Sequence, residues 1–198
     1  MTDAFSDPWI NSISSISAER IHAVGVITIR WNQCEFELFH LFREISGLQE
    51  AEAWASFCGL RHQEILKKIK GLVEQRNYHT DLVALIDNVL LFLDNCRVNR
   101  NAVAHAWTSS MINGEKVLAR KSRSRTKMDP IPFPSELLDL RRVADEIETA
   151  IVRLWLITCV IEDGSSSLPQ PSFGILTLPV SLMKDTNQPK TETQDELI

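Results

Sequence analysis

The fold class follows from the stretch between Ala18 and Gly47, which reads AERIHAVGVITIRWNQCEFELFHLFREISG. Apolar residues return along it at steps of three and four, which is the period of one face of an α-helix. These residues are Ile21, Val24, Ile27, Trp31, Cys34, Leu38, Leu41 and Ile45. Ser17 is a typical N-cap residue before this stripe and Gly47 is a typical stop after it, so we predict one long helix.

A second apolar row widens this stripe. Its members are Phe36, Phe39 and Phe42. A helix with such a broad apolar surface needs cover on more than one side, so we expect it to pack within a bundle or against a second subunit.

The helical period recurs in the rest of the chain. We expect further helices at Glu50–Cys58, Leu60–Arg76, Asp81 to about His105, and Ser135 to about Glu162. Between the last two, Asn-Gly at 113–114 separates two short runs and favours a β-hairpin within about residues 107–127. The sequence therefore predicts a mainly all-α fold, an antiparallel bundle of four to five helices with a small hairpin insert.

The ends of the chain differ in composition from this helical part. Residues 1–17 are Ser-rich and read as a lead-in, and residues 18–163 form the predicted helical domain. Residues 164–198 shift to Ser, Pro, Thr and Gln, so we expect an extended and partly disordered tail. Within that tail, Phe173 to Leu182 keeps apolar residues and is expected to pack as an extended strap.

Composition narrows the class of protein. The net charge of −5 argues against a protein that coats nucleic acids over its whole surface, although it permits a local basic patch. No apolar stretch is long enough to span a bilayer, and the first residues lack the pattern of a secretory signal. Four cysteines lie far apart, as in proteins of a reducing compartment, so we expect a cytoplasmic protein without membrane contact.

Two kinds of residue are expected to serve structure rather than chemistry. The histidines and cysteines share no ligand spacing, and the chain has no Gly-rich phosphate loop and no nucleophile elbow, so we predict no metal site and no cofactor. Three tryptophans, Trp31, Trp54 and Trp155, are expected in the core.

The helix predicted from Asp81 changes character near its end. Its apolar stripe includes Ile86, Leu90 and Leu93. On a helical wheel the same stripe continues through Arg97, Arg100 and Asn101, with His105 at its edge. An unpaired charge on a buried face costs several kcal/mol, so these groups need partners or must open onto a cleft.

Two arrangements meet that requirement. In the first, Arg100 pairs with a carboxylate of the first helix, for which Glu35 and Glu37 are the candidates, and His105 is a partly buried residue that closes the helix. In the second, Arg100, Asn101 and His105 form a functional site. The combination of the three residues where the apolar stripe breaks favours the second arrangement.

The run Arg100–His105, RNAVAH, resembles the Arg–polar–x3–His signature of HEPN domains. The organisation is also similar, with a long first helix, the motif near the end of a later helix and a closing helix, so the resemblance covers about Ala18 to Asp163. It implies a metal-independent endoribonuclease that works as a homodimer, in which two motif copies meet across a symmetric interface and leave a 2′,3′-cyclic phosphate product.

The resemblance also implies a role for each residue of the motif. His105 would transfer protons at the RNA 2′-hydroxyl or at the leaving oxygen. Arg100 would hold the scissile phosphate and stabilise the charge that develops on it. Asn101 precedes His105 by one helical turn, a spacing suited to orienting its ring or donating to the phosphate.

A basic run follows the motif. Residues 116–127 hold six Lys or Arg residues and no acidic one. One interpretation is an arm that grips RNA phosphates beside the site, and the other is a solvated hairpin edge whose charges discourage strand aggregation. The candidate substrate-binding residues are Arg97, Arg120, Lys121, Arg123 and Arg125.

Two functions from different classes remain open on the sequence. The first is an RNA-cleaving HEPN-type enzyme, such as a toxin or an anti-phage defence effector, with an antitoxin or another regulatory protein as a candidate partner. Toxins of this family that pair with nucleotidyltransferase antitoxins carry Tyr two places after the His, where this chain has Trp107. The alternative is a catalytically inactive HEPN-like module that binds a nucleotide or a partner protein, which the acidic net charge and Trp107 favour.

Overall fold

The computed structural model describes residues 8–9, 16–110, 116–121, 130–132, 136–164 and 174–182. Three long helices dominate it: α2 (Ala18–Ser46), α5 (Thr80–Ala104) and α6 (Leu137–Glu162). Two shorter helices, α3 (Glu50–Cys58) and α4 (His62–Glu74), connect α2 to α5. The prediction of a mainly all-α fold is therefore confirmed, and the observed helices begin and end within two residues of the predicted ends.

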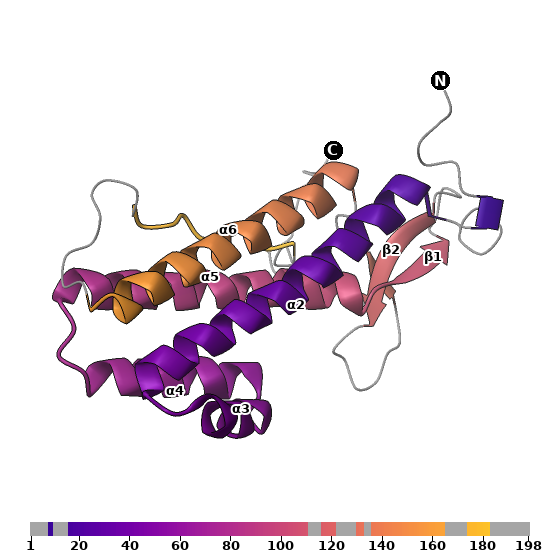
Figure 1. The fold of residues 1–198 in the computed structure, drawn as a ribbon. Helices are drawn as coiled ribbons and strands as arrows, with labels where there is room; N and C mark the ends of the chain where they lie inside the picture. Colours follow the sequence, from indigo (N-terminus) through magenta and orange to yellow (C-terminus); the bar gives the residue numbers. More distant parts are fainter. Residues whose placement is uncertain are drawn as a thin grey trace, which may run out of the picture.

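Helix α2 ends where the sequence places its stop. Gly47 has a φ of 67°, in the left-handed region that glycine enters without steric cost, and its N–H donates to the Arg43 carbonyl at 2.9 Å. The chain then turns into α3, and α3 and α4 cover one end of the bundle (Figure 1).

Helices α2 and α6 lie side by side along most of their length, with α5 behind them running in the opposite direction (Figure 1). Three ion pairs bridge α2 and α6 at 2.9 to 3.4 Å, and residue numbers increase together along them, so these two helices are parallel. The pairs are Arg20–Glu136, Arg30–Glu148 and Arg43–Glu162. Because α5 runs opposite to α2, and α6 runs opposite to α5, helices α2 and α6 point in the same direction.

The core lies between these three helices and α4. Of the stripe predicted on α2, the six residues from Ile27 onward are buried, and of its second row Phe39 and Phe42 are buried whereas Phe36 is exposed. Each fully buried aliphatic or aromatic side chain contributes about 1.5–3 kcal/mol of transfer free energy. No helix in the described part of the chain is long and apolar enough to cross a membrane.

A small antiparallel sheet follows α5 directly. Strand β1 (Trp107–Ser110) pairs with β2 (Lys116–Lys121), and β2 pairs with β3 (Pro130–Pro132). The expected Asn113–Gly114 turn lies outside the described residues. Strand β3 is at the edge of the sheet and contains two prolines. Proline suits an edge strand because it has no N–H to donate to a neighbouring strand.

The strap expected near the C-terminus is described from Gly174 to Leu182, and it runs extended along α5. Asn88 accepts from the Leu176 N–H at 2.8 Å and donates to its carbonyl at 3.2 Å. Asn99 donates to the Val180 carbonyl at 3.1 Å and accepts from the Leu182 N–H at 3.0 Å. The remainder of the predicted tail and most of the predicted lead-in lie outside the described residues.

The two asparagines are in register with the strap. Eleven residues of helix at about 1.5 Å each span roughly 16 Å, the length of about five extended residues at about 3.3 Å each. Asn88 and Asn99 therefore meet the strap at two points about five residues apart, and Leu182 at the second point is 1% exposed. The spacing of the two asparagines on α5 therefore matches the spacing of the strap residues that they bind.

We expect Asn99→Ala to destabilise the fold by about 1–3 kcal/mol, because it leaves the buried Leu182 N–H without its partner and removes one of the two donors to the Val180 carbonyl, the other being Arg142. Urea denaturation of the full chain measures this change. The matched control is Asn95→Ala on the same helix, since the Asn95 amide donates to the Leu91 carbonyl of its own helix, and this variant should change stability by less than about 0.5 kcal/mol. Equal stability of the two variants would show that the hydrogen bonds from Asn99 to the strap do not stabilise the fold.

Candidate functional site

The motif residues lie in the last turn of α5 and just beyond it. Arg100 and Asn101 are half-buried, and the Arg100 Nη1 donates to the Asn101 Oδ1 at 2.9 Å. His105 is the C-cap residue of α5, its side chain is exposed, and its backbone N–H donates to the Asn101 carbonyl at 3.1 Å. The helix thus places Arg100 and Asn101 in direct contact and His105 one turn further, at the open end.

Arg100 rests on an aromatic ring rather than on a carboxylate. Its Cζ lies 5.4 Å from the ring centroid of Trp31, a cation–π distance, and Trp31 is 1% exposed. Glu35 instead accepts a hydrogen bond from the Trp31 Nε1 at 2.8 Å. Within the described part of the chain, no Asp or Glu forms an ion pair with Arg100.

The direct Arg100–Glu35 or Arg100–Glu37 pair considered from the sequence is therefore not formed among the described residues. The structure shows instead that Glu35 accepts the Trp31 indole N–H on its own helix, while the guanidinium of Arg100 lies over the Trp31 ring.

Arg97 differs from Arg100 in this respect. Its Nε donates to the Asp94 Oδ1 at 2.8 Å, three residues earlier on the same helix. Both side chains are half-buried, so the pair compensates the Arg97 charge locally. Arg97 was predicted as a phosphate ligand, and in this structure its guanidinium has a carboxylate partner already.

His62, which no pattern in the sequence marks as a site residue, lies in the same cluster. His62 is the first residue of α4, and its ring centroid lies 5.4 Å from that of Trp31 at an interplanar angle of 40°. Burial, together with the positive charge of Arg97, lowers the pKa of His62 to about 4, so the ring is neutral at pH 7. Its Nε2 is buried and has no hydrogen-bond partner among the described residues.

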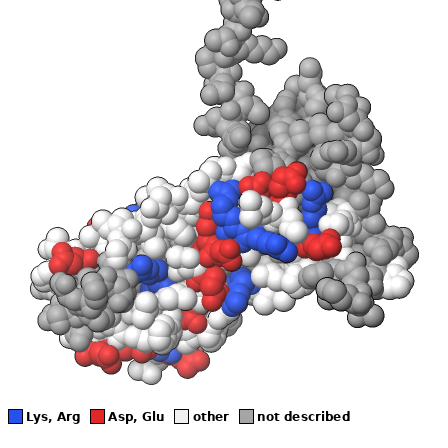
Figure 2. All heavy atoms as spheres, turned by 90° about the horizontal axis from the view of Figure 1, so that it is seen from above, with Lys and Arg blue, Asp and Glu red and all other residues white. Residues whose placement is uncertain are grey.

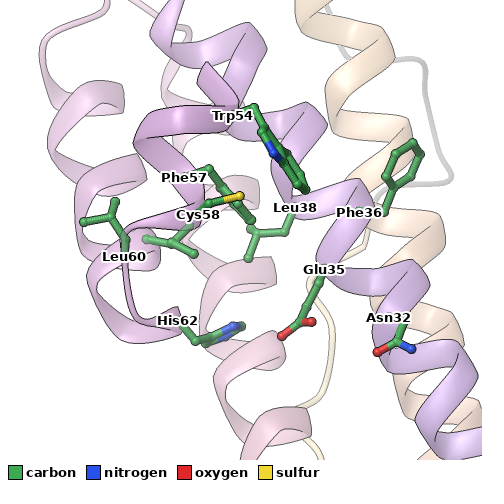
Figure 3. Close-up of a pocket in the computed structure, with 10 residues that line it drawn as sticks. Asn32, Glu35, Phe36, Leu38, Trp54, Phe57, Cys58, Leu60 and His62 are labelled. Atoms are coloured by element: carbon green, nitrogen blue, oxygen red, sulfur yellow. The ribbon is translucent and has the colours of Figure 1, made fainter. Parts of the chain in front are cut away.

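A cavity of about 430 Å³ opens beside His62, between α2, α3 and α4 (Figure 3). Trp54, Phe57 and Cys58 come from α3 at one end, whereas Glu35 and His62 point toward one another at the other end. The full lining comprises Asn32, Glu35, Phe36, Leu38, Trp54, Phe57, Cys58, Leu60, His62 and Ile65. The cavity thus combines an aromatic end with a polar end.

The expectation that three tryptophans lie in the core is confirmed for Trp31 and wrong for Trp54 and Trp155, each 53% exposed. Trp54 belongs to a nine-residue helix in which Ala53 is the buried residue. Such a short helix offers one narrow face to the core, so its indole lies on the surface and contacts the Phe39 ring edge-on at 5.0 Å.

The basic run is described in part. Arg120 and Lys121 belong to β2, whereas Arg123 and Arg125 lie outside the described residues. Ala119 of β2 is the pairing partner of Trp107, which follows His105 by two residues. The backbone of Arg120 is therefore close to the end of the motif.

Charge on the described surface is mixed. Figure 2 shows one face of the molecule, on which Lys and Arg lie interleaved with Asp and Glu among the described residues. The ion pairs between α2 and α6 are of this kind.

The described residues contain no group of three or more His, Cys, Asp or Glu arranged to hold a metal ion. Burial raises the pKa of the Cys34 and Cys96 thiols.

Compared with models of known protein families, with curated proteins and with solved structures, the chain shows no match.

We expect His62 to make the fold sensitive to acid. The unfolded chain protonates His62 near pH 6.5 and the folded chain near pH 4, so the unfolded state binds more protons between these values and stability falls as the pH falls through them. The loss should reach roughly 2–3 kcal/mol at pH 4. Urea denaturation between pH 7 and pH 4 measures it.

Two variants separate this effect from general acid denaturation. His62→Gln keeps a neutral side chain at every pH and should remove this part of the pH dependence. His79→Gln alters an exposed histidine at the N-terminal end of α5 and should keep the wild-type dependence of stability on pH. Identical pH dependence in His62→Gln and wild type would show that His62 does not stay neutral in the folded chain.

Proposed function

We propose that the protein is a HEPN-type endoribonuclease that cleaves RNA without a metal ion, at a site formed by Arg100, Asn101 and His105 from two copies of the chain. The observation that carries this proposal is the state of Arg100. It contacts Trp31 and Asn101, it has no ion-pair partner among the described residues, and an exposed histidine, His105, follows it by five residues. An anion is the natural partner of such a guanidinium.

The chemistry uses groups that the site contains. One His105 takes the proton of the RNA 2′-hydroxyl, the 2′-oxygen attacks the adjacent phosphorus, and the bond from phosphorus to the 5′-oxygen breaks. The His105 of the second copy gives a proton to the leaving 5′-oxygen. The products are a 2′,3′-cyclic phosphate end and a 5′-hydroxyl end. Arg100 binds the phosphate and stabilises the additional charge of the transition state.

The hydrogen bond between Arg100 and Asn101 supports separate roles for the residues of the motif. The bond from Arg100 to the Asn101 Oδ1 leaves the amide nitrogen of Asn101 as a donor for the phosphate or for His105. Arg120 and Lys121, which follow the motif on β2, add positive charge for the flanking phosphates. Because free RNA is abundant in the cytoplasm, such an enzyme would arrest growth there, which suits a toxin or a defence effector held in check by a regulatory protein.

The second candidate function is a catalytically inactive module that binds a nucleotide or a partner protein. The mixed charge on the face in Figure 2 and the net charge of −5 favour it, because an RNA enzyme gains from a continuous basic surface. The two candidates differ in what His105 does, since an inactive module does not require a proton-transfer group.

We expect His105→Ala to lower the single-turnover cleavage rate of a model RNA by about 10²–10⁴ while RNA affinity stays nearly unchanged. Arg100→Ala should weaken both binding and cleavage, because its charge acts in the ground state and in the transition state. The assay contains EDTA throughout. His79→Ala, an exposed histidine at the opposite end of α5, is the matched control and should cleave at the wild-type rate. Cleavage by His105→Ala at the wild-type rate would favour the binding module.

We expect the chain to form a dimer at the concentrations at which it cleaves RNA, because the proposed chemistry needs two copies of His105. Exposed apolar side chains on α2 and α6 offer surface for self-association. They include Ile29 on α2 and Val152 and Trp155 on α6. Sedimentation velocity should give a species of twice the 22.5 kDa chain mass. A monomer that still cleaves RNA would refute the composite site.

A further inference from the structure

We propose that the cavity between α2, α3 and α4 binds a nucleobase of the RNA whose phosphate lies at Arg100. This inference rests on the proposed function and adds a substrate subsite to it. It comes from the cavity geometry, from its two unlike ends and from the way Trp31 joins it to Arg100.

The size of the cavity suits a small flat ligand. Its volume of about 430 Å³ is at the lower end of the range of small-molecule sites, about 300–1,000 Å³. A base with its ribose is in this class, whereas a helix or a strand of a partner protein needs a longer groove.

The aromatic end can stack on a base. The Trp54 indole is 53% exposed even though it contacts the rings of Phe39 and Phe57. These contacts hold its orientation, so part of the ring surface remains accessible. Stacking of a base on an aromatic side chain contributes about 1–3 kcal/mol and accepts any base, because every base has a π-face.

The polar end can bind the edge of the same ring. The Nε2 of His62 is buried without a partner among the described residues, a state that costs about 1–3 kcal/mol until a ligand satisfies it. Glu35 points toward His62 and uses its Oε1 for the Trp31 indole, so other lone pairs of the carboxylate remain. Neutral His62 and the carboxylate of Glu35 together match a ring edge that carries both N–H donors and acceptors, as nucleobases do.

Trp31 connects this polar end to the proposed phosphate site. The rings of His62 and Trp31 are 5.4 Å apart, and the Arg100 guanidinium carbon is also 5.4 Å from the Trp31 ring. One indole therefore separates the group that would bind the base from the group that would bind the phosphate. In this proposal the base lies on the His62 side of the indole and the phosphate of the same nucleotide on its Arg100 side.

The test measures binding to the full-length chain by isothermal titration calorimetry, in the His105→Ala background and without RNA cleavage. The probes are the four ribonucleoside 5′-monophosphates, with ribose 5-phosphate as the probe that lacks a base. We expect saturable binding of at least one nucleotide and binding of ribose 5-phosphate that is at least tenfold weaker.

A pair of variants, one in the cavity lining and one outside it, localises the site. Trp54→Ala should weaken nucleotide binding by about 5- to 150-fold, the equivalent of the stacking contribution. Leu91→Ala removes an apolar side chain of similar exposure from α5, away from the cavity lining, and should leave binding unchanged. Glu35→Ala provides a second test. Because Trp54 contacts the Phe39 ring and Glu35 accepts from the buried Trp31 Nε1, thermal unfolding verifies that both variants are folded.

The outcomes separate this subsite from the nuclease proposal. Equal binding of ribose 5-phosphate and nucleotides, or nucleotide binding that neither Trp54→Ala nor Glu35→Ala weakens, would overturn the base subsite. Cleavage that depends on His105 could still be observed in either case, so the nuclease proposal would stand. Conversely, nucleotide binding that Trp54→Ala weakens would support the subsite even if no cleavage were found.

Discussion

The contact between Trp31 and its three polar neighbours is the interaction on which the core and the candidate site both depend. The indole is buried between α2, α4 and α5, where it fills the core that the apolar stripe of α2 begins. Its Nε1 donates to Glu35, and its ring lies against His62 and Arg100. A single large side chain thus determines where a carboxylate, an imidazole and a guanidinium lie relative to one another.

In this arrangement the Glu35 carboxylate and the Arg100 guanidinium both contact Trp31 and do not pair with each other. A carboxylate in direct contact with Arg100 would compensate its charge and compete with any anion for it. With the indole between them, Glu35 is satisfied by an N–H donor and Arg100 by a ring face. The same low-dielectric surroundings lower the pKa of His62, which remains a neutral hydrogen-bonding group and adds no repulsion to the two arginines nearby.

The strap imposes a second constraint on the same helix. Asn99 is directly before Arg100 in sequence and faces the other side of α5, where it binds the backbone of Val180 and Leu182. Asn99 is 1% exposed, so this polar contact is part of the core. The last turns of α5 are therefore held on one side by Trp31 and on the other by a segment about 80 residues further along the chain, which limits how far the motif can move.

Local features of the sequence determined the elements of this protein, and packing between helices decided the contacts of its site. The period of apolar residues from Ile27 to Ile45, the stop at Gly47 and the positions of Arg100 and His105 on one helix all depend on neighbours within a few residues, so they can be predicted from the chain. The partner of Arg100, the neutral state of His62 and the exposure of Trp54 depend on how α2, α3, α4 and α5 are rotated against one another. That rotation is the sum of many weak packing contacts between residues far apart in sequence, and no local pattern contains it.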